Sequence, residues 1–169
     1  MSALIAEFVS ESLENLERVD QDFVALEKRP GDREILARIF RAVHTLKGSC
    51  GFLGFSRLEA LAHSAESLLG MLRDGTRPLT PAITTALLQT LDGIRASLAA
   101  ITSTGQEGEV SHAAVIARLD ALRDGREAPA APAAPAAPAA PVITREPEPP
   151  PAPPQPAIAD PAEALRRAL

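Results

Sequence analysis

Prolines are distributed very unevenly along this chain of 169 residues, and their placement divides it into two parts. Three of the sixteen prolines lie before residue 128, and the other thirteen fall between Pro129 and Pro161. All ten glycines, by contrast, lie at or before Gly125. Because proline removes a backbone hydrogen-bond donor and breaks helices and central strands, a packed domain is predicted only over residues 1–125.

The proline-rich part opens with an Ala-Ala-Pro repeat. Such a composition cannot bury enough apolar surface to offset the entropy of the chain, so residues 126–158 are predicted to form an extended, semi-rigid linker. Asp160 and Pro161 then resemble an N-cap followed by a proline at the first helical position. Residues 159–169 are therefore expected to start a further segment, and the chain to be the front end of a longer protein.

Composition and charge exclude several classes of protein. Apolar residues make up 46% of the chain, but aromatic residues only 3%, and the many Ala and Leu residues argue against a sheet-rich fold. The net charge of −5 argues against a nucleic-acid-binding protein, which needs a basic surface. The N-terminus shows no signal-peptide pattern, no apolar run is long enough to span a membrane, and one cysteine cannot form an internal disulfide. A cytoplasmic protein is expected.

Apolar residues recur at helical spacing in five stretches of the first 125 residues. Ser2, Asp32 and Thr80 are expected to be N-caps, and Ser56 with Glu59 reads as a capping box for the third helix. Glycine or proline follows each of the first three stretches and predicts where it ends. We expect the helices over residues 3–28, 33–53, 57–74, 81–104 and 111–123.

The predicted fold class is all-α, since no strand pattern is visible. Short loops between the first four helices predict an antiparallel up-down-up-down four-helix bundle, with the fifth helix packed on it. Leu4 and Leu88 are expected on the buried faces of their helices, and Cys50 is expected to be a small core residue. His112 has no visible partner in the sequence and is expected at the surface.

The second helix carries a polar pattern that the packing of a bundle does not require. His44 falls at the edge of its apolar face, beside Phe40. Gly48 and Gly51 lie on the same side, although each glycine within a helix costs about 1 kcal/mol relative to alanine. Bare backbone beside His44 would let another macromolecule approach the imidazole, although close helix packing is the alternative reading of these glycines. Lys47 can place its ammonium group near whatever the imidazole carries.

The third helix presents Glu59, His63 and Glu66 along the edge of its buried face. An acidic residue there can face His44 across the antiparallel pair. A carboxylate that accepts a hydrogen bond from one imidazole nitrogen fixes the tautomer and leaves the other nitrogen as a nucleophile. The same residues could also bind a metal, but their spacing matches no standard metal-binding signature.

The stretch from His44 to Phe55, His-Thr-Leu-Lys-Gly-Ser-Cys-Gly-Phe-Leu-Gly-Phe, together with His63 and Glu66, closely resembles the histidine phosphotransfer (HPt) domain. Within that family it is most similar to the N-terminal domain of the CheA class of chemotaxis histidine kinases. The resemblance covers about residues 1–125. It rests on the spacing of the histidine, the Lys-Gly pair and the following glycine within a five-helix pattern.

This resemblance implies a role for each matching residue. His44 would be phosphorylated, Glu66 would hold the imidazole Nδ1 so that Nε2 attacks, and Lys47 would lie near the phosphoryl group. His63 would support the same network. A histidine kinase catalytic domain, acting in cis or in trans, would bind ATP and Mg²⁺ and supply the phosphoryl group, and an aspartate of a CheY-type response regulator would receive it.

The residues also leave other readings open. No ATP site is visible, since the glycines at 48, 51 and 54 do not follow a strand, so this chain alone is not expected to be an enzyme or to bind a cofactor. A helical scaffold whose polar patch serves only for docking is the alternative function. The surface for a partner is expected around His44, with Gly48 and Gly51 as its open floor and Leu13 as an apolar contact.

Overall fold

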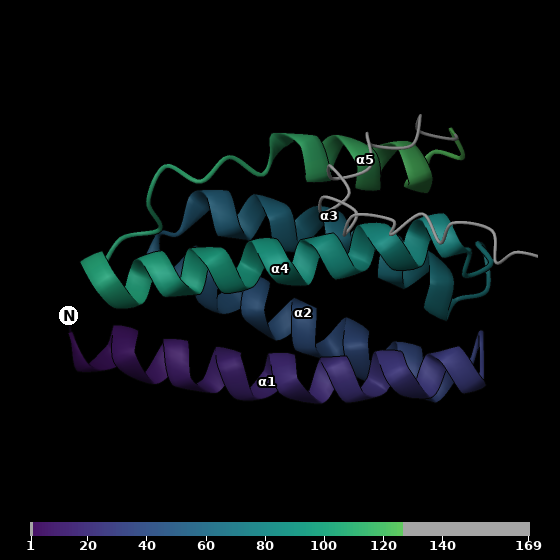
Figure 1. The fold of residues 1–169 in the computed structure, drawn as a ribbon, viewed down its shortest axis with the longest axis horizontal. Coiled ribbons are helices and arrows are strands. Elements are labelled where there is room, and N and C mark those ends of the chain that lie inside the picture. Colours follow the sequence, from purple (N-terminus) through teal and green to yellow (C-terminus); the bar gives the residue numbers. More distant parts are fainter. Residues whose placement is uncertain (1, 127–169) are drawn as a thin grey trace, which may run out of the picture. The chain divides into compact units, whose positions relative to one another are not determined.

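The computed structural model of this chain describes residues 2–126, and these form five helices. The first four helices run along the long axis of the bundle in alternating directions (Figure 1). Helix α1 packs on α2 and α4, α3 packs on α2 and α4, and α5 packs on α3 and α4. The bounds are α1 Ala3–Lys28, α2 Arg33–Leu53, α3 Ser56–Arg73, α4 Pro81–Thr104 and α5 Ala113–Arg123.

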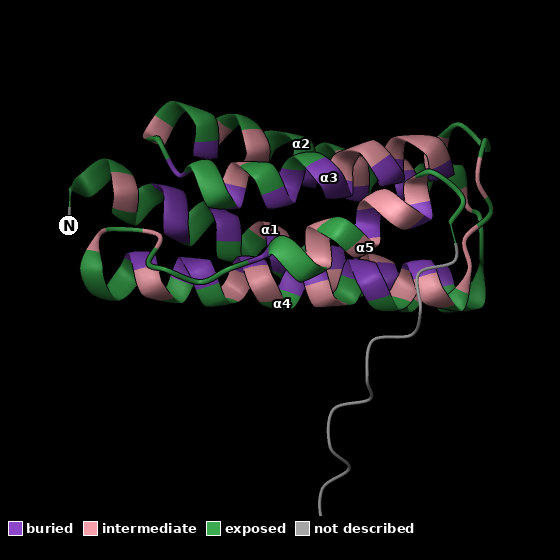
Figure 2. Cartoon of the chain, turned by 90° about the horizontal axis from the view of Figure 1, so that it is seen from above, coloured by how far each residue is buried: buried purple, intermediate pink, exposed green. Residues whose placement is uncertain are grey.

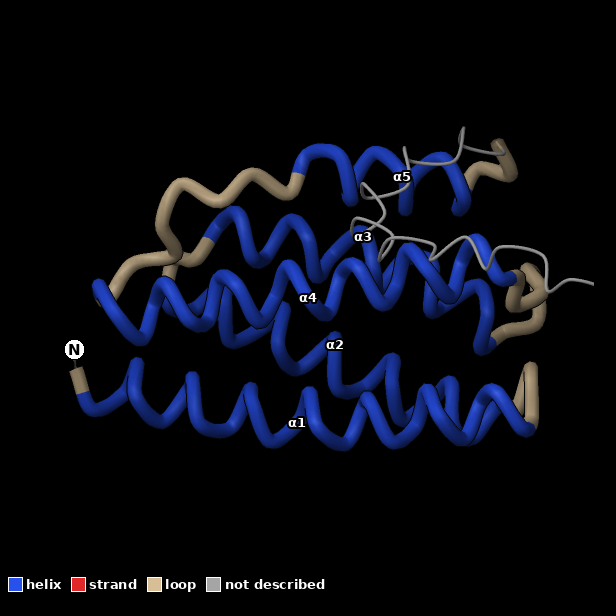
Figure 3. The backbone as a smooth tube through the Cα atoms, in the orientation of Figure 1, coloured by secondary structure: helices blue, strands red, loops and turns tan. Residues whose placement is uncertain are grey.

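This arrangement confirms the predicted all-α, up-down-up-down bundle with a fifth helix. Helices follow one another around the bundle in chain order, and α4 closes the ring against α1. Figure 3 shows loops at the two ends of the bundle, a longer loop that runs from the end of α4 back along the bundle to the start of α5, and no strand within residues 2–126. The linker expected over residues 126–158 and the segment expected over 159–169 lie outside the described residues, apart from Arg126.

Local sequence signals account for three of the helix starts. The side chains of Ser2, Asp32 and Thr80 each accept a hydrogen bond from a backbone N–H of the first turn that follows. Helices α2 and α4 end at Gly54 and Gly105, whose φ angles of 80° and 75° are in the left-handed region that glycine adopts without steric cost. Helix α5 begins at Ala113, two residues later than predicted.

The capping box predicted for the third helix is wrong. Ser56 is the first helical residue of α3, so the N-cap position falls on Phe55. The side chain of Phe55 makes no capping hydrogen bond. The cap comes instead from the loop between α4 and α5, where the carboxylate of Glu107 accepts hydrogen bonds from the backbone N–H groups of Arg57 and Leu58 at 3.0 Å. A distant residue therefore satisfies the free donors that open this helix.

The core lies along the faces that the helices turn toward one another (Figure 2). Cys50 is fully buried there, as expected, and burial raises the pKa of its thiol to about 12, with smaller contributions from Glu107 and Glu59. Leu4 and Leu88 depart from the predicted pattern, since both are exposed. None of the described helices combines the length and apolar character needed to span a membrane.

The surface position predicted for His112 is also wrong. Its side chain is buried between α4 and the start of α5, with 2.8 Å between its Nε2 atom and Oγ of Ser97. Gly93 of α4 provides the room, because a Cβ atom at this position would lie 3.1 Å from Nδ1 of the histidine. Burial lowers the pKa of His112, although Glu107 acts in the opposite direction.

Candidate functional site

His44 and Glu66 face each other across the antiparallel helices α2 and α3. The distance between Nδ1 of His44 and Oε1 of Glu66 is 2.6 Å, which is a short hydrogen bond. The His44 side chain is 60% exposed, whereas that of Glu66 is only 13% exposed. The imidazole is thus anchored at one nitrogen by a largely buried carboxylate while the rest of the ring is accessible to another molecule.

Lys47 contacts the second oxygen of the same carboxylate. Its Nζ atom lies 2.6 Å from Oε2 of Glu66, so one carboxylate holds both the histidine and the lysine. Burial opposes the charged form of Glu66, but the hydrogen bonds from Lys47 and His44 outweigh this effect, and the pKa of the carboxyl group is lowered. Glu66 therefore stays negatively charged at neutral pH and favours the tautomer in which Nδ1 of His44 carries the proton.

The imidazole of His44 is covered on one side and open on the other. The Phe40 ring, one turn earlier in α2, stacks on it with 6.0 Å between ring centroids and 13° between ring planes. The guanidinium group of Arg73, at the end of α3, lies 4.2 Å from the centroid of the Phe40 ring. Gly48, one turn after His44, has open space where a Cβ atom would stand. The sequence placed Phe40 beside His44, but offered no indication of the arginine.

Gly51 is exposed like Gly48, but a carboxylate from the neighbouring helix lies beside it. A Cβ atom at Gly51 would lie 3.1 Å from Oε1 of Glu59, which belongs to α3. Gly48 faces open space, whereas Gly51 lies beside the end of the Glu59 side chain, so the part of Gly51 in the open floor stays a prediction. His63 is exposed, and within residues 2–126 its ring makes no hydrogen bond or ion pair with His44, Lys47 or Glu66.

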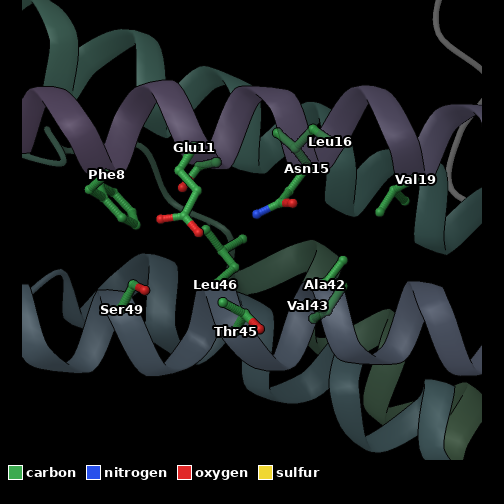
Figure 4. A pocket seen from close by; sticks show the side chains of 11 residues that line it. Phe8, Glu11, Asn15, Leu16, Val19, Ala42, Val43, Thr45, Leu46 and Ser49 are labelled. Atoms are coloured by element: carbon green, nitrogen blue, oxygen red, sulfur yellow. The ribbon is translucent and has the colours of Figure 1, made fainter.

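An apolar and acidic groove runs between α1 and α2 next to Gly48. We define this α1–α2 groove by five of its lining residues: Leu4, Glu7, Glu11, Gly48 and Phe52. Phe52 is 80% exposed, and its position places it on the same stripe of α2 as His44 and Gly48. Figure 4 shows the adjoining pocket farther along the same two helices, where Glu11 and Asn15 point from α1 toward α2. The groove thus presents an exposed aromatic ring about two helical turns along α2 from the histidine.

Leu13 is exposed, as predicted, but it does not line the α1–α2 groove. Asp20, seven residues later and therefore on the same face of α1, forms an ion pair with Arg95 of α4. Leu13 accordingly lies on the α4 flank of α1, away from His44. The exposed large apolar residues of the α1–α2 groove are instead Leu4 and Phe52.

The metal-binding alternative receives no support from the geometry. In the described part of the chain, no group of three or more His, Cys, Asp and Glu side chains is placed to hold a metal ion. His44 and Glu66 meet, but the Glu59 carboxylate lies beside Gly51, and within residues 2–126 the His63 ring makes no hydrogen bond or ion pair with His44 or Glu66. What the arrangement can do chemically is hold one imidazole nitrogen and present the other, which is the requirement for a nucleophilic histidine.

Comparisons with known proteins agree with this geometry. The Hpt domain family matches residues 3–97. The sensor histidine kinase CheAY of Helicobacter pylori is 37% identical over 107 residues, covering 63% of this chain and 13% of that protein. The chemotaxis protein CheA of Halobacterium salinarum is 36% identical over 105 residues, covering 62% of this chain and 16% of that protein. The match thus spans less than a fifth of the length of these relatives.

A solved structure shares the fold as well. The phosphorylated P1 domain of CheA3, in complex with CheY6 from R. sphaeroides, superposes with a TM-score of 0.68 and 28% sequence identity. The match covers 74% of this chain and 98% of the P1 domain.

Proposed function

Because this chain belongs to the Hpt domain family, we propose that it carries a phosphoryl group on His44 between a histidine kinase domain and a CheY-type response regulator. The observation that carries the proposal is the 2.6 Å contact between Nδ1 of His44 and Oε1 of Glu66 on an otherwise exposed ring. In the neutral ring, a proton on Nδ1 that is held by Glu66 leaves the lone pair of Nε2 for the reaction. The phosphorylated P1 domain bound to CheY6 in R. sphaeroides supports both the modification and the partner.

The proposed first step is nucleophilic displacement at phosphorus. The lone pair of Nε2 attacks the γ-phosphorus of ATP, a P–N bond forms, and the bond between the γ-phosphorus and the bridging oxygen breaks as ADP leaves with that electron pair. The proton on Nδ1 stays in the hydrogen bond to Glu66, whose negative charge stabilises the positive charge that develops on the ring. The kinase domain would supply ATP and Mg²⁺, so this chain acts as substrate and not as the kinase.

The second step returns the histidine to its starting state. A carboxylate oxygen of the regulator's aspartate attacks phosphorus, the P–N bond breaks, and its electron pair returns to Nε2. Lys47 has three N–H donors and uses one on Glu66, so the others remain for a phosphoryl oxygen. A supporting role for His63 stays a prediction. We place the relay in the cytoplasm, where ATP is available, with the kinase domain acting in cis or in trans.

Radiolabel transfer tests this function. The chain is incubated with labelled ATP and a CheA-type kinase core, and the label is followed in the wild type, His44→Gln and His63→Gln. We expect a label that is labile in acid and stable in base, as in a phosphoramidate, absent from His44→Gln and retained in His63→Gln. Folded wild-type chain that takes no label from several kinase cores would overturn the carrier role and favour the docking scaffold.

A further inference from the structure

Three side chains from α2 and α3 form a continuous stack that ends at the imidazole of His44. The guanidinium of Arg73 lies over the Phe40 ring, and the Phe40 ring stacks on the ring of His44. Arg73 lies seven residues after Glu66, on the same face of α3. Phe40 lies four residues before His44, on the same side of α2. The two helices therefore contact the histidine twice, at its Nδ1 atom and on its face.

The hydrogen bond to Glu66 leaves one motion of the imidazole free. It holds the Nδ1–Oε1 distance, but the two side-chain torsions of His44 can still change together at that distance, and such a motion tilts the ring and moves Nε2 away from an incoming phosphorus. The torsion between Cβ and an aromatic ring is soft, so packing must restrict it. A flat ring stacked at 13° does so from one side, and the empty position at Gly48 leaves the opposite side to the partner.

Side-chain direction in a helix explains why the stack forms on this side. Side chains of an α-helix lean toward its N-terminus, so the His44 ring leans toward Phe40, and a side chain at position 48 would lean over His44. Glycine at position 48 removes that cover. The motion of Phe40 is restricted by the guanidinium of Arg73 over its ring and by the α3 backbone beside it at Gly70. A Cβ atom at Gly70 would lie 3.5 Å from Cε2 of Phe40.

We propose that Phe40, clamped by Arg73, is a positioning residue that sets the ring plane of His44 and so aims Nε2 at phosphorus. This inference rests on the proposed phosphotransfer function for its kinetic consequence, but the restriction of the ring is a property of the unphosphorylated protein. Neither side chain takes part in bond making or bond breaking. Their contribution is to remove twisted orientations that cannot react, which lowers the entropy cost of reaching the productive geometry.

The test compares four variants of the full chain. Phe40→Leu removes the flat ring but keeps an apolar side chain, Phe40→Tyr restores the ring, and Arg73→Gln removes the cation that lies over the ring. Arg123→Gln is the matched control, because Arg123 ends α5 as Arg73 ends α3 and pairs with Asp124 as Arg73 pairs with Asp74, but it is not part of the stack.

Two measurements are made on each variant. The first is the rate of His44 phosphorylation by a CheA-type kinase core, and the second is the order of the His44 ring in the unphosphorylated chain, from NMR relaxation of its ring carbons and nuclear Overhauser effects to residue 40. We expect Phe40→Leu to slow phosphorylation about fivefold and to broaden the ring orientations. Arg73→Gln should slow it about twofold, while Phe40→Tyr and Arg123→Gln stay at the wild-type values.

The two readouts separate this proposal from the phosphotransfer function. If the wild type takes no label, the function fails, and the ring-order measurement still decides whether Phe40 positions His44. If the wild type is labelled but Phe40→Leu and Arg73→Gln keep its rate and ring order, the positioning role is overturned. A slower rate with unchanged ring order, or an equal loss in Arg123→Gln, would also overturn it, because the effect would then arise elsewhere.

Discussion

Lys47 holds one oxygen of the Glu66 carboxylate, with 2.6 Å between Nζ and Oε2, and leaves the other oxygen to His44. A single carboxylate thus connects the cation and the nucleophile of the proposed reaction. Both partners come from α2, three residues apart, while the carboxylate comes from α3. The packing of two antiparallel helices therefore sets the geometry of the whole site.

Substitution of Glu66 tests this connection. Glu66→Gln keeps the size of the side chain but removes the charge that orients the imidazole and stabilises its positive form, so we expect phosphorylation of His44 to slow on the order of 10- to 100-fold. Lys47→Ala should have a smaller effect, because the kinase domain neutralises most of the phosphate charge. Initial rates of labelling, with circular dichroism to verify folding, provide the measurement. A wild-type rate in Glu66→Gln would remove this residue from the mechanism.

The α1–α2 groove predicts where a response regulator docks. Phe52 lies in this groove on the stripe of α2 that carries His44, whereas Leu13 lies on the α4 flank of α1. We expect Phe52→Asp to weaken binding of a CheY-type regulator about tenfold, as for the loss of an exposed aromatic anchor. Leu13→Asp introduces the same charge on the other flank and should change the affinity less than about twofold. Titration calorimetry on both variants checks this, and the opposite ranking would restore the surface predicted from the sequence.

The cap of α3 can be assigned by stability measurements. Glu107→Gln weakens the acceptor for the N–H groups of Arg57 and Leu58, so the free energy of unfolding should fall by about 1 kcal/mol. Ser56→Ala should cost less than about 0.5 kcal/mol, since Ser56 does not cap the helix. Urea unfolding at neutral pH gives both values, with Glu109→Gln as a charge-matched control in the same loop. A larger loss for Ser56→Ala would favour the capping box instead.

Burial of His112 predicts a pH dependence of stability. Because burial lowers the pKa of His112 in the folded state, its stabilising contribution is fully present above the unfolded pKa of about 6.5 and is lost as the pH falls toward the folded pKa. The free energy of unfolding should therefore decrease from about pH 7 toward about pH 5.5, with a slope from this residue of at most about 1.4 kcal/mol per pH unit.

Two histidine variants isolate this contribution. His112→Gln should flatten the pH dependence over the same range, whereas His63→Gln, which alters an exposed histidine, should retain it. Urea unfolding at several pH values provides the comparison. An equal slope in wild type and His112→Gln would mean that His112 is not the titrating group.

The sequence alone determined the features that depend on neighbouring residues. Helix periodicity, the caps at Ser2, Asp32 and Thr80, and the stop at Gly54 all arise from interactions within a few residues, so they could be predicted locally. The sequence also predicted a carboxylate on the seam opposite His44, because the antiparallel arrangement of neighbouring helices and the helical spacing limit which residues can meet.

Only the tertiary structure decided the contacts that depend on how each helix is rotated and how the loops return. The Glu107 cap joins residues about fifty positions apart in the sequence. The His112 side chain is buried because Gly93, on another helix, leaves room for its ring. Leu13 lies on the α4 flank of α1 because of the way α1 is rotated in the bundle. Arg73 reaches Phe40 because of the way α3 is rotated against α2. Periodicity defines which side of a helix is apolar, but the close packing of the whole bundle fixes which polar residue at its edge meets which partner.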